Sequence, residues 1–253
     1  MIKIYFLGSG AASPSINRWH PSIAISYDGQ IGLLDCGEGC QIRLQQLGLS
    51  PLKIRFIALT HLHSDHFAGL LPLLQSMTLF NRRDVLYIIS PQEIRDLVDM
   101  FLRVSSHKLS FEIEYREPSS LNTFGKILLR GFEVCHNIKS FGYLIEISHK
   151  KRIYRICYTG DTRPCENVIS NCRGADILIH DATFSSSDSE EAVISGHSSV
   201  REAAEVAFKA GVERLYLFHI SSRYRDEDSL LREAREVFKN SFLVKDLDAI
   251  LIM

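Results

Sequence analysis

The chain has 253 residues, of which 45% are hydrophobic, and this composition is ordinary for a globular protein. Its formal net charge is −1, whereas proteins that bind nucleic acid through bulk electrostatics are usually basic. The apolar stretch at 67–80 is interrupted by Pro72, Gln75 and Ser76, and the first residues follow a strand pattern rather than a signal-peptide layout. We therefore expect a single domain over 1–253, no membrane partner, a cytoplasmic location and six reduced cysteines.

Strand and helix patterns alternate along the chain, which predicts a mixed α/β fold. Strands are expected at 2–7, 22–27, 31–35, 54–59, 85–90, 110–115, 127–135, 142–148, 153–159, 176–180, 214–218 and 248–252. Helices are expected at 38–47, 66–80, 91–104, 199–210 and 226–239. The helix at 199–210 has the clearest signals, because Ser199 and Glu202 form a capping-box pattern and Gly211 follows its last turn.

Residues 61–66 read His-Leu-His-Ser-Asp-His, directly after the strand expected at 54–59. His61 and His63 can point the same way, because side chains on a strand repeat every second residue. The following turn can bring Asp65 and His66 toward a second point nearby. Imidazole and carboxylate ligands suit zinc and neighbouring divalent transition metals. Four such groups do not easily close one tetrahedron, so this spacing suggests two metal ions.

The H-x-H-x-D-H pattern resembles the signature of the metallo-β-lactamase superfamily, which needs three further ligands downstream. The chain offers His136 after Gly131-Phe-Glu-Val-Cys135, Asp161 within Tyr158-Thr-Gly-Asp-Thr162, and His219 after Leu215-Tyr-Leu-Phe218. The resemblance implies an α/β fold of the metallo-β-lactamase type, an αβ/βα sandwich in which two mixed β-sheets are flanked by helices.

The flanking motifs are similar to those of the ribonuclease Z (tRNase Z) branch and extend over residues 6–224. They are Phe6-Leu-Gly-Ser-Gly10, Asp35-Cys-Gly-Glu-Gly39, Ser140-Phe-Gly-Tyr143, Gly160-Asp-Thr-Arg163, His180-Asp-Ala-Thr-Phe184, Gly196-His-Ser-Ser199 and His219-Ile-Ser-Ser-Arg-Tyr224. Two residues depart from the usual pattern, since Asp181 replaces a glutamate and Ser199 replaces a threonine.

The ribonuclease Z resemblance implies two Zn²⁺ ions per chain, with Mn²⁺ or Fe²⁺ as alternatives. A metal-bound hydroxide would attack a phosphodiester, as in a tRNA 3′-end endonuclease. One ion would be held by His61, His63 and His136, the other by Asp65, His66 and His219, and Asp161 would bridge them.

The same resemblance assigns the remaining roles in the reaction. Asp65 would orient the hydroxide, and His197 would protonate the leaving oxygen while Asp181 holds its imidazole in the useful tautomer. Arg223 and Ser140 would bind the substrate, and Arg223 would do so through a phosphate.

Only 24 residues separate His136 from Asp161, which is room for two strands and a turn. Family members that process tRNA typically carry a long tRNA-binding arm in this stretch. We therefore expect hydrolysis of small phosphodiesters with weak, salt-dependent binding of precursor tRNA. The expected binding partner is a phosphodiester substrate, which in this family is the 3′ end of an RNA. The resemblance also implies a homodimer. A small-molecule or cyclic-nucleotide phosphodiesterase is the alternative, and a non-catalytic nucleic-acid-binding accessory protein is less favoured.

Overall fold

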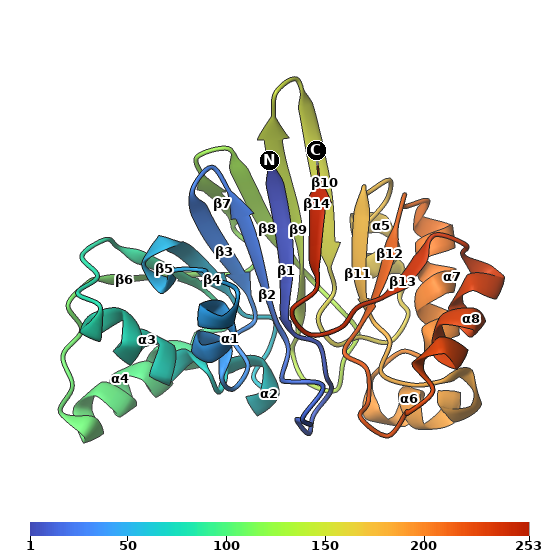
Figure 1. Cartoon of the computed structure of the whole chain (residues 1–253), viewed down its shortest axis with the longest axis horizontal. Coiled ribbons are helices and arrows are strands. Elements are labelled where there is room, and N and C mark those ends of the chain that lie inside the picture. The colour runs from blue at the N-terminus through green and yellow to red at the C-terminus, as the bar shows by residue number, and fades with distance from the viewer. Residues whose placement is uncertain (253) are drawn as a thin grey trace. The chain divides into compact units, whose positions relative to one another are not determined.

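The computed structural model describes residues 1–252, which fall into two compact units, each built on one seven-stranded sheet (Figure 1). The first unit contains residues 1–8 and 16–118 together with the C-terminal segment from Lys245, and the second contains residues 9–15 and 119–244. Two mixed sheets flanked by helices are the architecture that the sequence predicts. Within residues 1–252, no helix is long and apolar enough to cross a membrane.

The sheet of the first unit has the strand order β14-β1-β2-β3-β4-β5-β6. Strands β14 to β3 pair antiparallel, and strands β3 to β6 pair parallel. Helices α1, α3 and α4 bury Leu44, Leu73 and Val98 in one apolar core with sheet residues such as Leu33. The elements are β1 (Ile2–Gly8), β2 (Ser22–Tyr27), β3 (Gln30–Leu34), α1 (Cys40–Gln46), η1 (Pro51–Lys53), β4 (Ile54–Ala58), α2 (Ser64–Phe67), α3 (Leu70–Leu79), β5 (Leu86–Ile89), α4 (Glu93–Ser105), β6 (Ile113–Arg116) and β14 (Ala249–Ile252).

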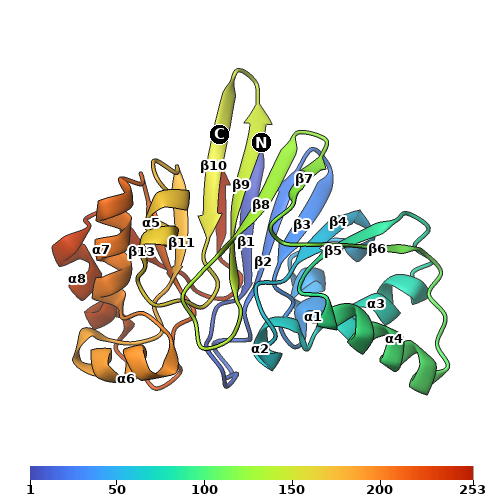
Figure 2. The ribbon, with the colours of Figure 1, turned by 180° about the vertical axis from the view of Figure 1, so that it is seen from behind.

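The sheet of the second unit has the order β13-β12-β11-β10-β9-β8-β7, with parallel pairs from β13 to β10 and antiparallel pairs from β10 to β7. Helices α5, α7 and α8 share an apolar core with this sheet, which includes Val168, Val206 and Leu230 (Figure 2). The elements are β7 (Leu121–Phe124), β8 (Ile127–Glu133), β9 (Phe141–His149), β10 (Arg152–Tyr158), α5 (Glu166–Asn171), β11 (Ile177–Asp181), η2 (Ser186–Asp188), α6 (Ser189–Ser195), α7 (Val200–Ala210), β12 (Leu215–Phe218), α8 (Glu227–Val237) and β13 (Ser241–Leu243).

The prediction of one helix over 66–80 is wrong, because the chain forms two helices, α2 and α3, that are separated at Gly69. The backbone N–H of Gly69 donates to the carbonyl of Cys36 at 2.9 Å. A Cβ atom at this position would lie 2.0 Å from the carbonyl oxygen of Gly37. The packing of residues 36–37 against Gly69 therefore ends α2 early. The segment that carries Asp65 and His66 is for this reason a single short turn of helix.

Six short elements, β7, β13, α5, α6, η1 and η2, have no counterpart in the sequence prediction. Each has seven residues or fewer, too short for a clear helical or strand period. The capping box on α7 is confirmed, since Ser199 accepts from the N–H of Glu202 and Gly211 adopts a left-handed conformation. The interval between His136 and Asp161 also agrees with the prediction. It holds β9, β10 and a turn at Lys150 and Lys151.

The expectation of six reduced cysteines is wrong, because Cys157 of β10 and Cys172 after α5 form a disulfide. Their Cα atoms lie 5.7 Å apart, within the range that a disulfide bridges. The sequence analysis did not predict α5. This helix directly precedes Cys172, and the chain brings Cys172 next to Cys157 of β10 at its end. Cys36, Cys40, Cys135 and Cys165 remain thiols.

Replacing both disulfide cysteines with alanine should lower the free energy of unfolding of the second unit by about 3 kcal/mol, because the bridge closes a short loop in the unfolded chain. The two cysteines are separated by 15 positions in the sequence. Chemical denaturation of the double variant, compared with Cys165→Ala, measures the difference. Equal stability of the two variants, or six titratable thiols in the unreduced denatured protein, would contradict it.

Candidate metal centre

The first ligand group lies in the loop that follows β4 and in the first turn of α2, within the first unit. His61, Asp65 and His66 are buried. The Nε2 atom of His61 lies 3.0 Å from Nδ1 of His63, and Nε2 of His66 lies 3.7 Å from a carboxylate oxygen of Asp65. The structure thus brings together the four side chains that residues 61–66 predict as ligands.

Asp35 belongs to this group by its contacts, although the sequence prediction did not include it among the site residues. One carboxylate oxygen of Asp35 lies 2.7 Å from Nδ1 of His66, and the other accepts from the backbone N–H of Thr60. The Thr60 hydroxyl lies 2.9 Å from Nδ1 of His61. Asp35 has a φ of 57°, a conformation that costs energy for a non-glycine residue and that is often kept at functional sites. Its place at the end of β3, in the Asp35-Cys-Gly-Glu-Gly39 motif, was the available signal.

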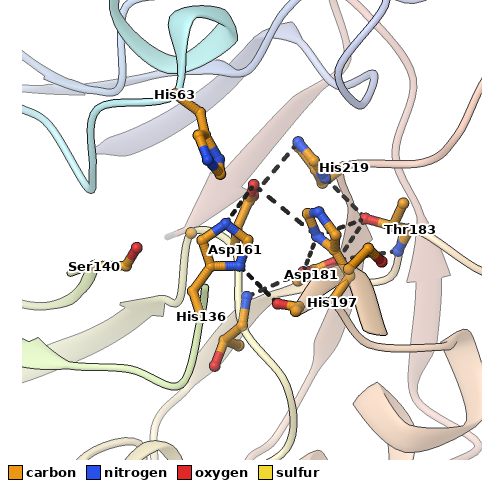
Figure 3. Close-up of polar contacts among 12 residues, drawn as sticks. His63, His136, Ser140, Asp161, Asp181, Thr183, His197 and His219 are labelled. Atoms are coloured by element: carbon orange, nitrogen blue, oxygen red, sulfur yellow. Dashed lines mark hydrogen bonds and ion pairs between the residues drawn. The ribbon is translucent and has the colours of Figure 1, made fainter. Parts of the chain in front are cut away.

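The second ligand group lies in the second unit, at the ends of β8, β10 and β12. Asp161 is at its centre (Figure 3). One carboxylate oxygen of Asp161 is 3.4 Å from Nε2 of His219, and the other is 4.0 Å from Nε2 of His136. Donor atoms of Asp161, Asp181, His197 and His219 lie within 4.8 Å of one another. The structure therefore gathers His136, Asp161 and His219, which are far apart in the sequence.

The Nδ1 atoms of His136 and His219, the ring nitrogens that do not face Asp161, contact uncharged oxygen atoms. Nδ1 of His136 is 2.7 Å from the carbonyl of Gly196, and Nδ1 of His219 is 2.8 Å from the hydroxyl of Thr183. Gly196 must be glycine here, because it has a φ of 82° and a Cβ atom would lie 2.9 Å from the His136 ring. Burial lowers the pKa of His136 in spite of Asp161, which favours the neutral imidazole that a metal needs.

Asp181 and His197 form a hydrogen-bonded pair beside Asp161, with 2.8 Å between a carboxylate oxygen and Nδ1 (Figure 3). The buried Asp181 carboxylate also accepts from the backbone N–H groups of Thr162 and Thr183. Burial would raise the pKa of Asp181, but the His197 imidazole lowers it overall. The ionised form of Asp181 is therefore favoured, and its carboxylate lies against Nδ1 of His197; the catalytic role of this pair stays a prediction.

Ser140 and Arg223, the predicted substrate-binding residues, are both engaged within the second unit. Ser140 is buried, and its hydroxyl donates to the carbonyl of Ile138, which shapes the loop after His136. The two terminal guanidinium nitrogens of Arg223, Nη1 and Nη2, donate to the carboxylate of Glu191, each at 2.7 Å. Substrate contact by either residue stays a prediction.

The donor chemistry of both groups fits divalent metal ions such as zinc. His61, His66, His136 and His219 each have Nδ1 against an oxygen atom, while Nε2 faces another ligand side chain. Metal-binding histidines have this arrangement, because the outer partner fixes the ring and its tautomer. Each group also supplies a carboxylate. Two mixed sheets whose strand ends carry these ligands define the metallo-β-lactamase class of proteins.

Comparison with known proteins agrees with this class and narrows it. Residues 32–220 match the family model described as a β-lactamase superfamily domain. Ribonuclease Z of Metallosphaera sedula is 37% identical over 98% of both chains, and that of Saccharolobus solfataricus is 36% identical over 100% of both. The crystal structure of human tRNase Z, short form, superposes with a TM-score of 0.85, covers 99% of both chains and is 29% identical. The chain belongs to the ribonuclease Z family.

The alignment with the Metallosphaera sedula protein also shows a difference in length. It spans 291 positions, although this chain has only 253 residues. That relative therefore carries residues with no counterpart here. In this chain a two-residue turn joins β9 and β10.

Proposed function

We propose that this protein is a metal-dependent phosphodiesterase that cleaves RNA at the 3′ end of precursor tRNA. The observation that carries the proposal is the set of buried imidazoles with fixed outer nitrogens in a chain whose whole length matches ribonuclease Z. A purely structural cluster of histidines would not need rings that turn Nε2 toward other ligand-type side chains while an oxygen atom holds Nδ1. The protein would act in the cytoplasm, and homodimer formation follows from the family resemblance alone.

The ligand assignment is also part of the proposal. Two zinc ions would be bound per chain, with Asp161 contacting both. When bound, the ions would lower the pKa of a water molecule and neutralise phosphate charge. The remaining ligands would be His61, His63 and His136 for one ion, and Asp65, His66 and His219 for the other. The support is the motif match and the donor chemistry described above.

The chain's own groups would then orient the reactants and move the proton. Asp65 would accept a hydrogen bond from the attacking water and fix its direction. His197 would act as the acid in its doubly protonated form, in which Nδ1–H donates to Asp181 and the proton on Nε2 passes to the leaving ribose oxygen, which leaves a neutral imidazole. Asp181 would stay ionised and stabilise the protonated imidazole. Ser140 would shape the loop that borders the substrate, and Arg223 would contact a phosphate next to the scissile bond.

An activity panel on the zinc-loaded protein tests this function. We expect cleavage of a 3′-extended precursor tRNA at low salt and loss of that cleavage with a chelator. Affinity should fall steeply toward about 0.15 M salt, because a chain without an arm must hold RNA with few cationic groups. Hydrolysis of bis(p-nitrophenyl) phosphate or 2′,3′-cyclic nucleotides without any cleavage of precursor tRNA would contradict the proposal. That outcome would support the alternative of a small-molecule phosphodiesterase, which the short β9–β10 turn favours.

A further inference from the structure

The guanidinium group of Arg223 is occupied by an internal anion. Its Nη1 and Nη2 atoms each donate to one oxygen of Glu191, both at 2.7 Å, so the carboxylate is bound in a bidentate way. Arginine binds carboxylates and phosphates through the same planar fork. A phosphate that approached Arg223 along this edge would therefore compete directly with Glu191.

The position of Arg223 does not depend on Glu191 alone. Its guanidinium carbon lies 5.1 Å from the centre of the Phe184 ring, which supports the guanidinium from beneath. The next residue, Tyr224, donates to Asp188, and its hydroxyl accepts from the backbone N–H of Ser185 at 3.0 Å. The segment that carries Arg223 would thus keep its place if the Glu191 carboxylate were lost.

The contact between Arg223 and Glu191 is also easily exchanged. The two side chains are 46% and 51% exposed, so water screens their attraction. Glu191 lies on α6. The residue after that helix, Gly196, contacts Nδ1 of the candidate ligand His136 through its carbonyl oxygen. The Phe184 ring under Arg223 also lies 6.1 Å from the His197 ring, between centroids, so a phosphate bound at Arg223 would lie near the proposed acid.

We propose that Glu191 is a specificity-determining residue that competes with RNA phosphate for Arg223. In the free protein Glu191 fills the guanidinium fork, and bound RNA displaces it. This inference rests on the proposed function, in which Arg223 contacts a substrate phosphate. Glu191 would then lower the affinity for RNA and leave unchanged the binding of a small diester, whose single phosphate does not reach Arg223.

Glu191→Gln tests the inference, with Glu190→Gln as the matched control. Glu190 is exposed on the same helix, so its replacement removes the same charge without releasing Arg223. Relative to that control, Glu191→Gln should tighten binding of fluorescein-labelled mature tRNA to the zinc-loaded protein by about threefold to tenfold. The KM for precursor tRNA should fall by a similar factor with kcat unchanged, and the KM for bis(p-nitrophenyl) phosphate should not move.

Three outcomes would overturn the inference. Glu191→Gln could bind RNA no better than Glu190→Gln, or it could bind RNA more weakly, which would mean that Glu191 orients Arg223 for substrate. The gain could also persist in an Arg223→Ala background, where no guanidinium remains to be released. Tighter RNA binding by Glu191→Gln without cleavage of RNA by the wild type would refute the proposed function and leave this inference standing.

Discussion

Replacing Asp161 with alanine should reduce cleavage of RNA and of bis(p-nitrophenyl) phosphate by at least about three orders of magnitude, because the proposed assignment makes Asp161 a ligand of both metal ions, and their loss would remove several kcal/mol of transition-state stabilisation. Its two oxygens lie on the sides of His219 and His136, at 3.4 and 4.0 Å. Loss of Asp161 also leaves two buried imidazoles without the anion between them. Both substrates should suffer alike, since the defect lies in metal binding rather than in recognition.

The measurement combines kinetics with elemental analysis. Wild-type protein saturated with zinc should hold close to two equivalents, and Asp161→Ala should hold fewer. Asp228→Ala, which removes an exposed carboxylate of the same unit, should behave as the wild type. Matching far-UV spectra of the variants in chelator would exclude unfolding as the cause. One equivalent or none in the wild type at saturating zinc would defeat the dinuclear assignment.

His197→Ala should lower turnover of RNA by about 10²–10⁴-fold without changing the zinc content, because general acid catalysis contributes that much to the reaction. Nδ1 of His197 is held by Asp181 at 2.8 Å, and its ring stacks on His219 with 5.2 Å between centroids. The imidazole is therefore fixed beside the ligand group. The loss should be much smaller for bis(p-nitrophenyl) phosphate, whose p-nitrophenolate leaves without a proton.

Comparison of the two substrates separates proton donation from positioning. An equal loss on both would show that His197 orients the substrate rather than protonates it. Asp181→Asn should produce the same preference for the activated ester in a weaker form, because it removes the charge that stabilises the protonated imidazole. His107→Ala serves as the control, since His107 is an exposed histidine of the other unit.

The sequence by itself determined the features whose signal is local. The four candidate ligands of residues 61–66 can be predicted from the sequence because strand and turn geometry act over a few residues. The capping box of α7 is readable for the same reason, since Ser199 and Glu202 are neighbours on one turn. Most strands of both sheets follow from apolar runs. The family resemblance added His136, Asp161 and His219, whose spacing alone indicates no common site.

Only the tertiary structure decided the partners of these groups. Asp35 faces His66 because β3 and β4 are parallel neighbours, and the Gly196 carbonyl meets His136 across 60 positions of sequence. The Cys157–Cys172 disulfide depends on α5, which is too short to leave a clear pattern. The pairing of Arg223 with Glu191 depends in the same way on the short helix α6. Periodicity reports which face of an element is buried, whereas contacts between distant residues depend on strand order and packing, which no local pattern encodes.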